Sequence, residues 1–299
     1  MNAHVVRSVY QLAALITCLM AGTSAQLALP SPAAADAFFF ATGAPNGLMA
    51  TGSAPSVSGS LEIESADDFV LNAPTVINQA TFTGLLTGTA QTSTIGQVTV
   101  EIYRVFPKDS INPPSGTVPT RVNSPSDVAL TERSNLAGGG LTVQTTLVNS
   151  NFTAANSVLN GIHPIPNQTT GGEGGVTGRE VQFTVNFTNP LNLPADHYFF
   201  VPQVQASGGN FLWLSGPRPI VSPGGTPFTP DLQSWIRNES LDPNWLRIGT
   251  DIVGGATPPT FNGSFSLSGT TVPEPTTWLL LGSGLAGLLW RKASMQNRR

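Results

Sequence analysis

Alternation of hydrophobic and polar residues is the clearest pattern in the middle of this chain. In the stretch VQFTVNFT, residues 181–188, valine and phenylalanine alternate with glutamine, threonine and asparagine. A period of two gathers the apolar side chains on one face of an extended chain, and it does not fit the 3.6-residue period of a helix. We therefore predict a half-buried strand whose inward face is formed by Val181, Phe183, Val185 and Phe187.

Shorter segments along the chain repeat this pattern. LEIE at 61–64, QVTVEIYR at 97–104 and SFSLS at 264–268 alternate, and their predicted inward residues are Val98, Val100, Ile102, Phe265 and Leu267. HYFFVPQV at 197–204 and FLWLS at 211–215 are continuous apolar runs, which is typical of strands covered on both faces. Glycine and proline turns separate the segments, so we predict an all-β fold, a single β-sandwich or jelly-roll-like domain over residues 38–271.

Three stretches are too long for simple hairpin turns. They span residues 106–127, 163–178 and 215–235 and are rich in proline, glycine and serine. Any helix in the domain is expected to be short and to lie within them. The segment 257–272 reads as a last strand that leads into a short stalk.

The first 25 residues read as a secretory signal peptide. Arg7 precedes an apolar stretch that ends in small residues, and a second small-residue site places the cut as late as residue 37. Export through the Sec machinery follows from this interpretation. Cys18 is the only cysteine and lies inside the predicted signal, so its removal leaves a mature protein without thiols. The alternative, lipidation at Cys18, lacks the usual small residue before the cysteine.

Charge is distributed unevenly along the chain. Between residues 26 and 275 there are eight basic and 17 acidic side chains, a net charge of −9. An acidic exported domain is repelled by phosphates, which argues against a nucleic-acid partner. The C-terminus differs: residues 276–290 carry no charge and are followed by Arg291 and Lys292. Because a comfortable span takes about 20 residues, we predict a short membrane segment whose basic tail stays in the cytoplasm.

Val272, Pro273, Glu274 and Pro275, followed by the apolar run and the basic tail of residues 272–299, resemble the PEP-CTERM sorting signal of Gram-negative bacteria that make exopolysaccharide. This resemblance implies recognition and cutting by exosortase, a membrane-embedded processing enzyme, and makes these residues a substrate tag. The two prolines hold the tag extended. ADDFVL at 66–71, VTVEIYR at 98–104 and FSLSGT at 265–270 are also similar to a secreted β-sandwich module found ahead of such tails.

Two tryptophans and two arginines are candidates for contact with a glycan. The segment 231–248 contains Trp235, Arg237, Trp245 and Arg247, a mixture of aromatic rings and charges that suits stacking and hydrogen bonding to sugars. The same residues equally suit stapling of a loop onto the edge of the sandwich.

Acidic residues cluster around Asp67 and Asp68, with Glu62 and Glu64 on the predicted solvent face of the same strand. A soluble surface is one interpretation, and a calcium site is the other, since Ca²⁺ prefers oxygen ligands. No other cofactor is indicated.

No motif of a known catalytic site occurs around His163 or His197, so we predict no enzyme activity. The sequence predicts a non-enzymatic cell-surface or matrix protein, processed and held at the cytoplasmic membrane through its tail. The alternative is a glycan-binding or calcium-dependent lectin-like module that acts in exopolysaccharide.

Overall fold

The structure is a computed structural model that describes residues 35–57, 61–111, 116–163, 165–166, 168–217, 233–273 and 284. Residues Ala35–Pro273 form one compact unit. The predicted signal peptide lies outside the described residues, as do Glu274, Pro275, Arg291, Lys292 and, apart from Gly284, the predicted membrane segment. In the part of the chain that is described, no helix is both long and apolar enough to cross a bilayer.

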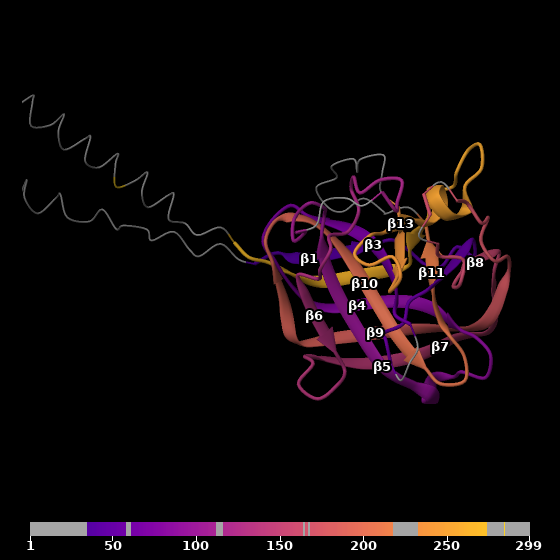
Figure 1. The fold of residues 1–299 in the computed structure, drawn as a ribbon. Coiled ribbons are helices and arrows are strands. Elements are labelled where there is room, and N and C mark those ends of the chain that lie inside the picture. Colours follow the sequence, from indigo (N-terminus) through magenta and orange to yellow (C-terminus); the bar gives the residue numbers. More distant parts are fainter. Residues whose placement is uncertain are drawn as a thin grey trace, which may run out of the picture. The chain divides into compact units, whose positions relative to one another are not determined.

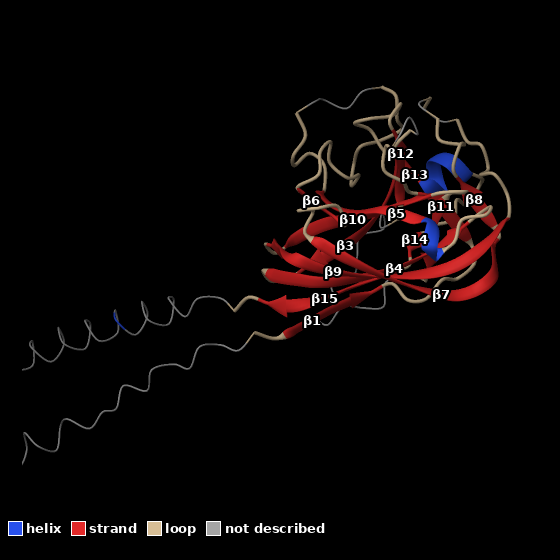
Figure 2. Ribbon diagram, turned by 90° about the horizontal axis from the view of Figure 1, so that it is seen from below, coloured by secondary structure: helices blue, strands red, loops and turns tan. Residues whose placement is uncertain are grey.

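Two sheets face each other and confirm the all-β prediction (Figures 1 and 2). The larger sheet has the order β1 (Ala37–Ala41), β15 (Phe265–Thr271), β4 (Thr75–Leu86), β11 (Phe211–Gly216), β2 (Met49–Gly52) and β8 (Asn156–Val158). Beside this path, β9 (Val176–Leu193) pairs with β4, β7 (Leu141–Ala154) pairs with β9, and β14 (Asn262–Gly263) pairs with β11. The smaller sheet has the order β13 (Leu246–Arg247), β12 (Trp235–Asn238), β3 (Ile63–Leu71), β10 (Asp196–Ala206), β5 (Ile95–Arg104) and β6 (Thr131–Ser134).

In the described part of the domain the helical segments are short, as predicted, but they lie outside the three long loops. A 3-10 turn, η1 (Thr92–Thr94), joins β4 to β5, and a single π-helical turn, η2 (Ile248–Val253), follows β13. Gly254 ends η2 with a φ of 69°, a value that suits glycine because it has no Cβ. Within the described part of residues 35–273, turns between strands rather than the long loops therefore hold the helical residues.

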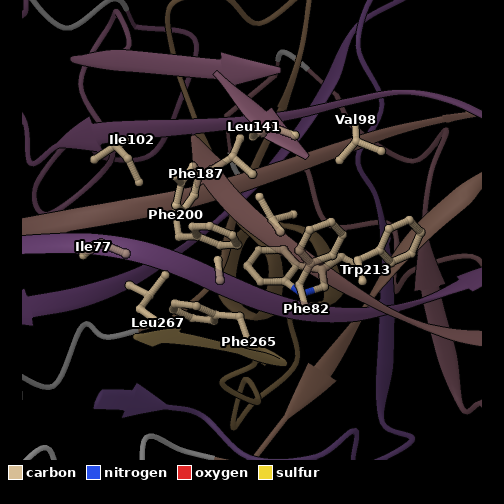
Figure 3. Packing of buried hydrophobic residues seen from close by; sticks show 14 of the residues in the cluster. Ile77, Phe82, Val98, Ile102, Leu141, Phe187, Phe200, Trp213, Phe265 and Leu267 are labelled. Carbon is tan, nitrogen blue, oxygen red and sulfur yellow. The ribbon is translucent and has the colours of Figure 1, made fainter. Parts of the chain in front are cut away.

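The predicted inward faces meet in one core between the two sheets. Figure 3 shows Phe82, Trp213 and Phe265 of the larger sheet beside Phe200 of the smaller one. The rings of Phe82 and Phe183 stack with centroids 4.7 Å apart, and those of Phe200 and Phe265 with centroids 5.0 Å apart. Each such pair adds about 0.5–1.5 kcal/mol beyond the burial of its area.

Both faces of the smaller sheet are covered, which explains the continuous apolar run in β10. Loops, rather than a third sheet, lie over its outer face (Figure 2). Beneath them a second apolar cluster is formed by Ala66, Tyr103, Phe199, Val201, Trp235 and Trp245. The outer face of the larger sheet instead carries the polar half of the alternating pattern, including Thr81, Gln182, Thr184 and Ser266.

Candidate functional site

The C-terminal tag begins where the last strand ends. Strand β15 runs to Thr271, whose backbone N–H donates to the carbonyl of Asp36 at 2.8 Å, and the N–H of Val272 donates to the carbonyl of Pro74 at 2.7 Å. The expected stalk is therefore absent from the described residues, and Pro273 follows directly from the sandwich. The reason is that GTT at residues 269–271 continues the ladder with β4 instead of leaving it.

A cavity of about 260 Å³ lies beside this exit point. Val272, 44% exposed, lines it together with Pro74, Leu193 and Pro194. The neighbouring strand β1 starts at Ala37 and pairs with β15, so both ends of the compact unit leave from the same edge. The first two residues of the tag, Val272 and Pro273, thus lie at this edge of the folded domain.

The two candidate tryptophans are interior residues. Trp235 belongs to β12 and Trp245 precedes β13, and both side chains are fully buried. The indole N–H of Trp245 donates to the carbonyl of Ser126 at 3.2 Å, which ties the loop 106–130 to the sheet. Buried rings offer no face to a sugar, so the structure places these residues where loop stapling requires them.

Arg237 is the centre of a buried charged cluster over the outer face of the smaller sheet. Its guanidinium pairs with the carboxylate of Glu64, donates to the hydroxyl of Tyr103 at 2.9 Å and lies 4.4 Å from the ring centroid of Trp245. The prediction that Glu64 faces solvent is wrong: it is 4% exposed. Loops cover the face that alternation alone assigns to water.

Two glutamate side chains of this cluster face the same tyrosine hydroxyl. The hydroxyl of Tyr103 lies 2.7 Å from Glu64 Oε1 and 3.1 Å from Glu101 Oε2, but it has a single proton to donate. Burial, followed by the charge of Glu64, raises the pKa of Glu101 to about 9. Glu101 therefore holds its proton to a higher pH than an ordinary glutamate, and Glu64 is the side chain that Arg237 contacts directly.

Arg247 holds the π-helical turn η2 that follows it through contacts with Asp251. Its Nη2 lies 2.9 Å from Asp251 Oδ1, and its backbone N–H donates to Asp251 Oδ2 at 2.8 Å. The guanidinium also lies 5.9 Å from the ring centroid of Trp235. The four residues proposed for glycan contact thus lie near one another, but their contacts are internal.

Asp67 and Asp68 lie on opposite faces of β3, because neighbouring strand residues alternate. Asp67 lies between the sheets, where it accepts hydrogen bonds from the N–H of Gly263 at 2.9 Å and the hydroxyl of Ser234 at 3.1 Å. Burial and the charge of Asp68 raise its pKa well above the ordinary value. The structure does not bring the two carboxylates to one ion, and no group of three or more His, Cys, Asp or Glu among the described residues is placed to hold a metal.

An aspartate–histidine pair was missed by the sequence reasoning. The Nε2 of His197 lies 2.5 Å from Asp68 Oδ2, although the two are 129 residues apart in the chain. Pairing of β3 with β10 creates this contact, and no local motif signals it. Asp196, the neighbour of His197, pairs instead with Lys108 at 2.5 Å. Burial raises the pKa of Asp68, and the hydrogen bond from His197 opposes that rise.

A comparison with family models finds a PEP-CTERM protein-sorting motif over residues 271–293. This range includes Val272, Pro273, Glu274 and Pro275 as well as Arg291 and Lys292, and it confirms the resemblance seen in the sequence. Searches of curated proteins and of solved structures find no match. The chain thus carries a PEP-CTERM tail, which indicates an exported protein sorted through its C-terminus, on a sandwich for which these searches show no relative.

Proposed function

We propose that this protein is a non-enzymatic cell-surface or matrix protein that is exported through the Sec machinery, sorted through its tail and cut by an exosortase-type enzyme. The observation that carries the proposal is the sorting motif, which starts at the last residue of β15. A folded domain whose last strand ends at the first residue of the sorting motif is a suitable substrate, because the enzyme grips the tag while the sandwich stays intact.

The tail acts first as a processing signal and second as an anchor. Residues 276–290 are shorter than an easy permanent span, so they hold the precursor in the cytoplasmic membrane with Arg291 and Lys292 inside. Cutting near Glu274 then leaves a mature domain that ends within a few residues of Thr271. Delivery to the cell surface or to exopolysaccharide follows that cut.

The absence of enzyme activity is part of the proposal. It is supported by the engagement of ionisable side chains in internal pairs: Arg237 with Glu64, Arg121 with Asp127 and His197 with Asp68. Such pairs fix loops and strands to one another. They leave the sandwich as a scaffold whose loops are held in place.

The experiment is the double substitution Pro273→Ala with Glu274→Ala, expressed in the native host. Export should persist, whereas an uncut precursor should accumulate in the membrane fraction. The matched control is Pro258→Ala with Glu239→Ala, two exposed positions of the sandwich, which should mature normally. Intact-mass spectrometry of the mature protein is the readout. A mature form that still contains residues 276–299 in cells with an active exosortase would contradict the proposal.

A further inference from the structure

A cavity of about 290 Å³ lies over the polar outer face of the larger sheet. It is lined by Thr83 of β4 and by Glu180 and Gln182 of β9, three polar residues that we call its floor, and also by Pro45 and Val148. None of these residues belongs to the sorting motif or to the buried cluster around Arg237. The site is therefore independent of the function proposed above.

Strand β7 pairs irregularly with β9 where it borders this cavity. Glu180 belongs to the same side of β9 as Gln182 and Thr184, the side that the sequence predicts to be exposed. The register between β7 and β9 shifts on both sides of Asn149, which lies opposite Glu180. Val148 precedes this irregular point and lines the cavity, while Glu180 is only 7% exposed.

Glu180 is 7% exposed as a residue, but its carboxylate oxygens are not among the fully buried side-chain atoms that lack a partner in the described part of the chain, so solvent in the cavity reaches them. Among the described residues, no side chain or backbone group forms a hydrogen bond or ion pair with it. Its neighbour Arg179 donates to the carbonyl of Ala90 at 2.9 Å instead. Burial raises the pKa of Glu180, with no hydrogen bond to oppose the rise. The carboxylate is therefore available to a ligand that enters the cavity.

A second buried polar side chain in the cavity is also free within the described part of the chain. Thr83 is 5% exposed, and its hydroxyl makes no side-chain hydrogen bond there. Other hydroxyls of the cavity are paired: that of Thr81 lies 2.6 Å from that of Ser266, and that of Ser264 donates to Gly43 at 2.8 Å. The free groups are thus a carboxylate, a hydroxyl and the amide of Gln182, and together they both donate and accept hydrogen bonds.

These groups define the chemical class of the ligand. Each hydroxyl of a sugar ring can both donate and accept a hydrogen bond. Neighbouring hydroxyls of one ring can therefore pair with the carboxylate, the hydroxyl and the amide of this cavity. Calcium takes six to eight oxygen ligands, and the floor provides a single carboxylate. Pro45 and Val148 present apolar surface to the C–H groups of such a ring. We propose that this cavity binds one sugar residue through Glu180, Gln182 and Thr83.

The test is saturation-transfer NMR on the purified full chain in detergent. The probes are the methyl glycosides of glucose, galactose, mannose and N-acetylglucosamine, with methylammonium as a competitor. At least one glycoside should bind, and Glu180→Gln, Thr83→Val and Val148→Trp should each weaken that binding about tenfold or more, as expected for a lost hydrogen bond to a charged group or a filled cavity. Glu132→Gln, which changes an exposed carboxylate on β6, should bind as the parent does.

The substitutions also separate a loss of binding from a loss of folding. Val148 is 55% exposed, so its replacement blocks the cavity without altering the core, and circular dichroism checks the fold of each variant. The proposal is overturned if none of the four glycosides binds, or if folded Val148→Trp binds them unchanged. Displacement of a bound glycoside by methylammonium at equal concentration would assign the cavity to cationic ligands instead.

Discussion

Replacement of Arg237 by methionine should destabilise the sandwich strongly. The change removes the only charge that balances Glu64 within the described cluster, and the side chains of Arg237 and Glu64 are 7% and 5% exposed. Removing one partner of a buried pair leaves an uncompensated charge and costs about 3–5 kcal/mol. For a domain of this size each kcal/mol lowers the melting temperature by about 2–4 °C, so the expected loss is roughly 6–20 °C.

The control is Lys108→Met, which breaks an exposed pair. The side chains of Lys108 and Asp196 are 49% and 24% exposed, and such pairs contribute about 0–1 kcal/mol. The double variant Arg237→Met with Glu64→Met should recover part of the loss, because it removes the stranded charge as well. Differential scanning calorimetry and urea denaturation give the melting temperatures and free energies of unfolding.

Two results would refute this reasoning about Arg237. One is a shift for Arg237→Met no larger than that of the Lys108 control. The other is a double variant whose loss of unfolding free energy equals the sum of the two single losses, since that would show no coupling between the partners. Either result would mean that water enters the cluster and screens it.

Other parts of the structure predict further outcomes. Because the folded pKa of Glu101 is about 9 and its ordinary value is 4.5, its contribution to stability is fully present below pH about 4.5 and is lost as the pH rises toward 9. Glu101→Gln should flatten this decline in the free energy of unfolding measured across that window, and an unchanged slope would assign the decline to other groups. Trp245→Ala should lower the free energy of unfolding by about 3–5 kcal/mol, because the ring is fully buried. A melting temperature close to that of the parent would contradict the burial of this ring.

The sequence indicated which residues of the candidate glycan site lie together, but not whether their side chains are exposed or buried. Trp235, Trp245, Arg237 and Arg247 do lie near one another, as their spacing suggested, but loops bury the tryptophans. Burial by a loop depends on contacts between residues that are far apart in the chain. Trp245 and Ser126, for example, are more than 100 residues apart. No periodicity within β12 encodes such contacts.

Glu180 was overlooked for a related reason. Continued backward from Gln182, the alternation of β9 places Glu180 on the polar face, and this is correct. Alternation says which face a side chain takes, but not whether that face meets water. Only the irregular passage of β7 and the presence of Pro45 and Val148 around the cavity decide that.

By itself the sequence determined the strand faces, the all-β class and the sorting tail. Period-two alternation acts within one strand, and the apolar half of Val181–Phe187 is buried wherever that strand packs, so local pattern is sufficient. The sorting motif is likewise read from consecutive residues. Tertiary structure alone decided that Glu64 is paired with Arg237, that Asp68 meets His197 and that Glu180 faces a cavity. Each of these depends on which strands become neighbours and which loops cover them, and a charge separated by more than a hundred residues from its partner leaves no mark in the local sequence.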